Sequence, residues 1–263
     1  MDAFFVSVEE VLNPSLKDKP VIVGGNINSR GVVAAASYVA RKYGVQSAMP
    51  IAKAKRLCPH AIFLRSSHRF YSEYSTKVFE ILRSYSPLVE PMSLDEAFID
   101  LTGCGKLHGP VLKTAETIRN EIKGQLGLNA SIGIATNKLI AKIASAYCKP
   151  NGMLWIAPGS EQQFLAPLPI KRIPGIGLKG STKLNRMGVH SVADLARLPL
   201  EILEEIYGKW GVSLYYKARG ISNSPVITET KDPRSISRET TLDTDSIDTL
   251  FLESTLSYLT EKS

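Results

Sequence analysis

Cysteine and histidine are scarce in this sequence, and neither is spaced like a metal site. The three cysteines are an odd number with no close spacing, which argues against a disulfide framework and a zinc site and favours a reducing cytoplasm. The four histidines share no ligand spacing, so we interpret them as surface or packing residues. These seven residues are Cys58, Cys104, Cys148, His60, His68, His108 and His190.

Long apolar runs are also missing. No run approaches the length of a membrane-spanning helix, and the given sequence does not open with a basic and then apolar leader. It contains no internal repeat, phosphate-binding P-loop, Ser-His-Asp order or acidic pattern of a proofreading exonuclease. We therefore expect a cytoplasmic protein without a membrane partner.

The composition is that of a globular protein with an excess of positive charge. Hydrophobic residues make up 44% and charged residues 22% of the 263 residues, and the net charge is +7. This length is enough for one large or two ordinary domains. A basic excess favours a polyanionic partner, nucleic acid first and a membrane surface second.

Hydrophobic periodicity in the first 160 residues predicts alternating strands and helices. Their order suggests an α+β fold in which a small antiparallel sheet is backed by helices, as in ferredoxin-like domains. We expect strands at residues 1–8, 20–25, 130–135 and 153–156, helices at 71–82, 111–122 and 137–147, and a hairpin at 88–101.

The remainder of the chain changes character. From about residue 161 to 221 the pattern is all-helical, with glycine-bearing turns at 173–177 and 208–211. Residues 231–234 are typical of a linker. Beyond it, residues 235–240 predict a strand and 247–259 a helix, which make too little core to fold alone.

Asp95 and Glu96 form a candidate metal site. Adjacent side chains on a regular strand face opposite ways, so both reach one ion only at a hairpin tip, where the flanking pattern places them. Two carboxylates plus water and substrate phosphates suit Mg²⁺. Taken alone, an Asp-Glu pair is more often a solvated acidic turn.

Several motifs surround this pair and follow one another along the chain: Asp2-Ala3-Phe4-Phe5-Val6-Ser7-Val8-Glu9, Arg30-Gly31-Val32-Val33-Ala34, Ser37-Tyr38-Val39-Ala40-Arg41, Ser93-Leu94-Asp95-Glu96-Ala97, Asn137-Lys138, Ala141-Lys142-Ile143-Ala144-Ser145, Lys149-Pro150-Asn151-Gly152 and Ile173-Pro174-Gly175-Ile176-Gly177. These motifs resemble those of the Y-family DNA polymerases, which replicate past lesions. The resemblance covers essentially the whole chain, in order, and is closest to the polymerase IV branch of bacteria and archaea.

The resemblance implies a low-fidelity, template-directed polymerase for translesion synthesis and DNA repair. Such a polymerase would transfer a nucleotide from a dNTP to a primer 3′-hydroxyl with two Mg²⁺ ions. Asp95 and Glu96 would be the catalytic carboxylates and metal ligands, with the backbone carbonyl of Met1 as a further ligand. The nucleotide-binding residues implied are Phe4, Phe5, Tyr38, Arg41 and Lys149, of which Phe5 is the steric gate that excludes a 2′-hydroxyl.

The same resemblance implies a domain order and a DNA grip. Palm and fingers would occupy residues 1–160, with fingers at about 11–68, a helix-hairpin-helix thumb 161–230, and a linker with the start of an α/β little finger 231–263. In the thumb, glycines let backbone N–H groups approach a DNA phosphate and lysines add charge. These residues are Gly175, Gly177, Lys179 and Lys183.

The sequence also departs from the family pattern. The family's first catalytic carboxylate lies just before the position of Met1, its little finger continues past Ser263, and a hydroxyl residue often replaces Ala35. We therefore expect the 263 residues to be catalytically feeble and leave a DNA-binding fragment as an alternative. A cyclase is a third possible function. The helix-hairpin-helix motif argues against it, because a cyclase has no duplex DNA to hold. We expect a monomer that binds primer-template DNA, with any sliding-clamp contact outside this sequence.

Overall fold

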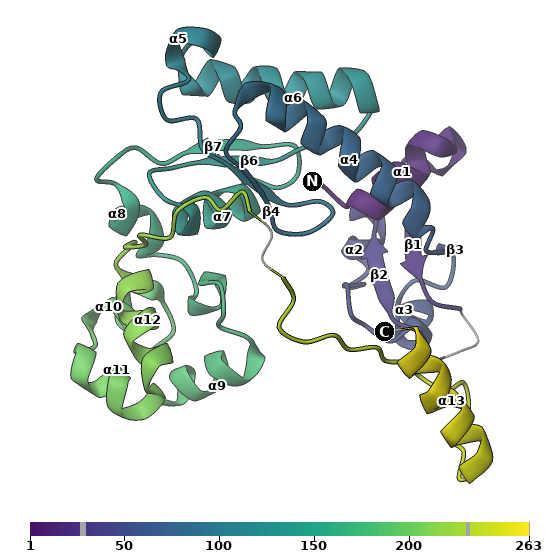
Figure 1. Cartoon of the computed structure of the whole chain (residues 1–263). Helices are drawn as coiled ribbons and strands as arrows, with labels where there is room; N and C mark the ends of the chain where they lie inside the picture. Colours follow the sequence, from purple (N-terminus) through teal and green to yellow (C-terminus); the bar gives the residue numbers. More distant parts are fainter. Residues whose placement is uncertain (27–29, 230–231, 263) are drawn as a thin grey trace. The chain divides into compact units, whose positions relative to one another are not determined.

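A computed structural model describes residues 1–26, 30–229 and 232–262 (Figure 1). The fold is mixed α+β. Contacts divide the chain into two units, each described by itself: Met1–Asp2 with Lys77–Thr228, and Ala3–Thr76 with Glu229–Ser263. The predicted linker begins at Lys231, which lies outside the described residues. In the described part, no helix is both long and apolar enough to cross a membrane.

The palm strands of the first unit form two pairs. β4 (Val89–Pro91) and β5 (Ala97–Ile99) pair antiparallel, which confirms the predicted hairpin. β6 (Ile132–Ile134) and β7 (Met153–Trp155) pair in parallel, so the expectation of a wholly antiparallel sheet was wrong. The reason is the connection, because α7 (Lys138–Tyr147) crosses over between the two strands and returns the chain in the same direction.

Helices cover both sides of these strands, which lie between α6 (Val111–Leu126) and α7 in Figure 1. The end of α4 (His68–Tyr85) is joined to α6 by a hydrogen bond from the Tyr85 hydroxyl to Glu121 (2.6 Å). A one-turn helix, α5 (Gly105–His108), precedes α6. The α4, α6 and α7 helices agree with the periodicity of the sequence.

The thumb is all-helical, as expected. Its core is formed by fully buried leucines contributed by four successive helices: Leu184, Leu195, Leu203 and Leu214. A capping box at Ser191 and Asp194 fixes the start of one helix. The elements are α8 (Glu161–Leu165), η2 (Ile170–Arg172), α9 (Leu178–Arg186), α10 (Val192–Arg197), α11 (Leu200–Tyr207) and α12 (Lys209–Ala218).

The second unit contains a three-stranded sheet. β1 (Val21–Gly24) is the central strand of this sheet, and all its residues are buried. It pairs antiparallel with β2 (Val33–Ala36) and parallel with β3 (Ile62–Arg65). The other elements are η1 (Pro14–Leu16), α2 (Tyr38–Lys42) and α3 (Ile51–Leu57).

The first residues are helical, so the strand predicted at residues 1–8 was wrong. α1 (Phe4–Leu12) begins after Ala3, whose carbonyl accepts the Ser7 N–H at 2.9 Å. Phe4, Val6 and Val8 are buried, and the side chains between them are half-buried. A short helix that is apolar on most sides shows no helical period, and the alternation of burial imitates a strand.

The tail agrees with its prediction only in part. α13 (Thr249–Glu261) is present, close to the helix expected at 247–259. The strand expected at 235–240 is absent from this described segment, whose residues are all exposed. No described strand pairs with it, and an isolated strand cannot satisfy its backbone groups.

Candidate active site

The Asp95-Glu96 pair lies at the tip of the β4–β5 hairpin, as predicted. Met92 N and Ser93 N both donate to the Glu96 carbonyl oxygen, at 2.8 and 3.3 Å, and close the turn. The Ser93 hydroxyl donates to Asp95 Oδ1 at 2.9 Å and accepts from Asp95 N at 3.3 Å. Because Asp95 and Glu96 lie in the turn, their side chains need not point to opposite faces as they would on a regular strand.

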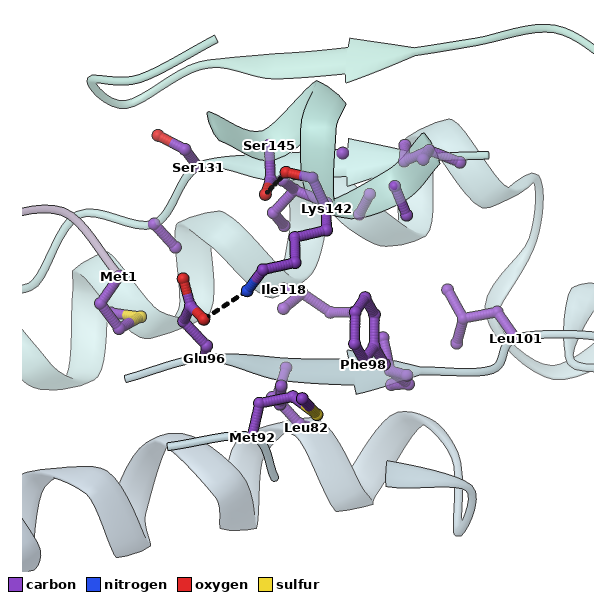
Figure 2. Close-up of a pocket in the computed structure, with 18 of the residues that line it drawn as sticks. Met1, Leu82, Met92, Glu96, Phe98, Leu101, Ile118, Ser131, Lys142 and Ser145 are labelled. Atoms are coloured by element: carbon purple, nitrogen blue, oxygen red, sulfur yellow. Dashed lines mark hydrogen bonds and ion pairs between the residues drawn. The ribbon is translucent and has the colours of Figure 1, made fainter. Parts of the chain in front are cut away.

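One lysine contacts an oxygen atom of this tip, and a second contacts the neighbouring Met1 carbonyl. Lys142 Nζ lies 2.6 Å from Glu96 Oε2 (Figure 2), and Lys149 Nζ lies 2.5 Å from the Met1 carbonyl oxygen. The Met1 amino group donates to the Asp95 carbonyl oxygen at 2.6 Å. The structure thus brings together all three predicted metal-ligand residues and Lys149.

The pKa of Glu96 reflects these contacts. Partial burial raises this pKa, but the hydrogen bond from Lys142 and the positive charges of Lys142, the amino terminus and Lys149 lower it below its usual value. Glu96 is therefore a carboxylate at neutral pH. Its side chain remains 48% exposed, so it can be reached by a ligand.

Asp2 is buried and holds neighbouring segments of the chain together. Its side chain is 2% exposed and accepts hydrogen bonds from the Ser131 hydroxyl (2.9 Å to each oxygen) and from Asn151 N (2.7 Å). Lys149 Nζ lies 3.5 Å away. Asp2 thereby fixes the loop that carries Lys149.

Sequence reasoning missed Lys142 as a functional residue. It was quoted only as part of a motif, although its spacing from Lys138 (one helical turn) places both ammonium groups on one face of α7. Lys138 pairs with Glu90 at 2.5 Å. The repeat of lysines at i and i+4 was the available signal.

A cavity of about 440 Å³ opens beside the tip. Its lining includes four charged residues, Asp95, Glu96, Lys142 and Lys149. It also includes apolar side chains such as Phe98, Leu82 and Ile118 (Figure 2). Charged groups in a partly apolar cavity experience a lower dielectric than in water, which strengthens their interactions with a bound anion or cation.

The oxygen atoms of the tip fit a hard divalent cation. In the described residues no group of three or more His, Cys, Asp or Glu side chains is close enough to hold a metal by itself. The donor set would instead be two carboxylates and the Met1 carbonyl, completed by water or phosphate. The contacts with Lys142 and Lys149 show that these oxygens already stabilise positive charge.

The other predicted nucleotide-binding residues belong to the second unit. Arg41 Nε donates to the Ala36 carbonyl at 3.0 Å, and its guanidinium lies 4.8 Å from the centre of the Tyr38 ring. Phe5 stacks on Tyr71. Phe4 is only 4% exposed, so its side chain is a core residue rather than a surface for a ligand.

The four residues predicted to bind DNA lie in α9 or in the loop that precedes it. Gly175 has φ +97°, a conformation that favours glycine, and Lys217 Nζ fixes the loop by donating to the Pro174 carbonyl at 3.1 Å. No described side chain caps the N-terminus of α9, which begins after Gly177. Its first N–H groups can therefore donate to an anion. Lys179 in the first turn of α9 and Lys183 in its last turn are both exposed.

Comparisons with known proteins agree with this architecture. The impB/mucB/samB family matches residues 1–146, and the thumb domain of DNA polymerase iota matches residues 171–222. DNA polymerase IV of Dehalococcoides mccartyi strain BAV1 is 50% identical over 262 residues, which cover 100% of this chain and 67% of that protein. DNA polymerase IV of Desulfatibacillum aliphaticivorans is 49% identical over 92% of this chain and 61% of its own length.

Solved structures show the same fold. A Y-family polymerase chimera, Dbh-Dpo4(243-245)-Dbh, superposes with a TM-score of 0.88 at 34% identity and covers 99% of this chain and 77% of that chain. DinB from Sulfolobus solfataricus gives a TM-score of 0.78 at 37% identity, over 86% of this chain and 67% of that chain. The chain therefore belongs to the Y-family DNA polymerases of the polymerase IV type and spans about 67% of the length of such a relative.

Proposed function

We propose that the chain carries the catalytic part of a low-fidelity, template-directed DNA polymerase that acts in translesion synthesis and DNA repair. The observation that carries this proposal is the Asp95-Glu96 tip, whose two carboxylates line one cavity together with Lys142 and Lys149. A similar solved structure, with a TM-score of 0.77, is titled as the insertion ternary complex of Dbh DNA polymerase.

Two Mg²⁺ ions are the proposed cofactor. Asp95, Glu96 and the Met1 carbonyl would hold them, and when bound they supply activation of the primer 3′-hydroxyl and neutralisation of the leaving pyrophosphate. The protein's own part is to hold these oxygens at a fixed tip. Lys149, which is held by the loop anchored on Asp2, would donate to a phosphate oxygen of the incoming nucleotide.

We assign the remaining nucleotide contacts to Phe5, Tyr38 and Arg41. The Arg41 guanidinium would bind phosphate oxygens, and its contact with Tyr38 fixes its direction. Phe5 would lie beneath the sugar as the steric gate. Because the Phe4 side chain is buried, only its backbone is available to a nucleotide.

The thumb would hold duplex DNA without reading its sequence. The exposed start of α9, with Gly175 and Gly177, would accept a phosphate, and Lys179 and Lys183 would add attraction that weakens with salt. We retain the domain assignment of palm and fingers at 1–160, thumb at 161–230 and little finger from 231.

Single-nucleotide primer extension by the 263-residue chain tests the proposal. We expect slow, Mg²⁺- and template-dependent incorporation that Asp95→Asn lowers by at least about 10²-fold. Asp100→Asn is the matched control, because Asp100 accepts the Thr102 N–H at 2.8 Å at the far end of β5. Equal incorporation by wild type and Asp95→Asn would refute the catalytic assignment.

The alternative is a DNA-binding fragment without catalysis, which the exposed thumb residues alone would support. Fluorescence anisotropy of labelled primer-template DNA separates the two functions. Duplex binding that Lys179→Ala and Lys183→Ala weaken, together with no detectable incorporation, would favour the alternative.

A further inference from the structure

Phe5 is supported from behind by a second aromatic ring. The Phe5 and Tyr71 rings lie 4.1 Å apart, centre to centre, and are inclined by only 10°. Phe5 comes from α1 and Tyr71 from α4, and both residues belong to the second unit. His68, one turn before Tyr71, meets both rings edge-on at 6.2 Å. Phe5 is half-buried, so the stack covers one of its faces.

Tyr71 itself has little freedom to move. Its side chain is fully buried, and its hydroxyl donates to Glu9 Oε1 at 2.7 Å. Glu9 lies one turn after Phe5 on α1, so Tyr71 contacts the same face of that helix at two points. Burial and the hydrogen bond to Glu9 raise the pKa of Tyr71 above its usual value, so the hydroxyl remains a donor at neutral pH.

A steric gate has to resist a displacement about as small as one oxygen atom. An unsupported phenylalanine ring can turn away from its preferred rotamer at low cost, and such a movement would admit a 2′-hydroxyl. A ring stacked on a fixed neighbour cannot move in this way, because the neighbour fills the space behind it. The rigidity of the gate therefore depends on the residue behind it.

We propose that Tyr71 is a positioning residue for the Phe5 gate and sets how strongly the enzyme rejects ribonucleotides. The inference rests on the proposed polymerase function and on Phe5 as the gate. Tyr71 acts by holding the Phe5 ring, and Glu9 acts by holding the plane of Tyr71. The chemical group discriminated is the 2′-hydroxyl of the incoming nucleotide.

The test compares one dNTP with the matching rNTP on the same primer-template complex. Both the binding affinity and kcat/KM are measured, so that discrimination is obtained even where turnover is slow. Phe5→Ala should abolish most of the discrimination. Tyr71→Leu should lower it about tenfold, mainly by admitting the rNTP, and Tyr71→Phe, which keeps the ring but loses the Glu9 contact, about two- to threefold.

Tyr85→Phe is the matched control. Tyr85 also lies on α4 and also donates to a glutamate, Glu121 at 2.6 Å, but its ring packs against His108. Its substitution should leave the discrimination unchanged. The double variant F5A/Y71L should discriminate no worse than Phe5→Ala alone, because a support has no effect once the gate is gone.

The failure of each proposal has its own signature. If Phe5→Ala leaves the discrimination intact, the gate assignment under the proposed function is wrong. If Phe5→Ala lowers it but Tyr71→Leu and Tyr71→Phe lower dNTP and rNTP use equally, Tyr71 is only a core residue and the inference is overturned. Should Tyr71→Leu fail to fold in a thermal melt, Tyr71→Phe against Tyr85→Phe decides.

Discussion

Two lysine–glutamate pairs on the same helix differ in what surrounds them. Lys138 and Lys142 lie one turn apart on α7 and pair with Glu90 (2.5 Å) and Glu96 (2.6 Å) of one hairpin. The side chains of the first pair are 15% and 14% exposed, and those of the second 36% and 48%. Distances this similar cannot explain different roles, so the difference lies in solvation.

The Lys138–Glu90 pair is built into the structure. Glu90 also accepts the Ile227 N–H at 2.8 Å, and Lys138 also donates to the Pro225 carbonyl at 2.8 Å. The pair thus fixes the segment that follows the thumb to the palm. Burial raises the pKa of Glu90, but the hydrogen bonds from Lys138 and Ile227 more than offset it and lower the pKa below its usual value.

The Lys142–Glu96 pair has no such additional partners among the described contacts, and it lines the cavity. An exposed pair is weak because water competes with it. It can therefore be opened by a ligand at little cost. One helix therefore carries a buried pair and an exposed pair that lines the cavity.

Gly133→Ala should have the largest effect, because it disturbs both pairs at once. A Cβ at Gly133 would lie 2.0 Å from the Ala141 carbonyl oxygen and 2.4 Å from Ser145 N, so α7 would have to move away from β6. We expect a loss of more than about 3 kcal/mol in the free energy of unfolding, measured in urea. Gly124→Ala on α6, which meets nothing within 4 Å, is the control and should be neutral or slightly stabilising. An equal loss of stability in both variants would contradict the close packing of α7 against β6 at Gly133.

Lys138→Met should separate the pairs by stability. It leaves the Glu90 carboxylate nearly buried and unpaired, which we expect to cost about 3 kcal/mol. Lys142→Met leaves Glu96 solvated and should cost less than about 1 kcal/mol. Urea unfolding of both variants checks this order, and equal losses would remove the basis of the comparison.

The effect of pH on stability should be smaller and confined to acid. Because the folded-state pKa of Glu90 lies below its ordinary value of 4.5, its contribution is complete above that pH and is lost as the pH falls through the folded pKa. The stability difference between wild type and Glu90→Gln should therefore shrink below about pH 4.5. A difference that stays constant from neutral to acid pH would contradict the ion pair.

The hairpin tip could be predicted from the sequence because its signal is local. Alternation up to Asp95 and after Glu96 defines two strands and a turn without any distant contact. The burial that distinguishes Glu90 from Glu96 could not, because it depends on Ile227, which is 137 residues away. The helix at Phe4 was missed because it is apolar on most sides.

The direction of the β6–β7 pair was missed for a related reason. Period-two patterns identify strands but carry no information on whether a pair is parallel, which is decided by the crossover through α7. The stacking of Tyr71 behind Phe5 also joins two helices far apart in sequence. The pattern at Tyr71 predicted a helix correctly but not what its side chain supports.

Single-nucleotide incorporation by Glu96→Gln and Glu90→Gln, with unfolding measured on the same samples, tests the central claim most directly. Both changes remove one negative charge from the same hairpin. We predict that Glu96→Gln loses at least about 10²-fold in incorporation with nearly unchanged stability. Glu90→Gln should instead lose stability and retain most of its incorporation. Equal loss of incorporation in the two variants, or full incorporation by Glu96→Gln, would contradict this prediction.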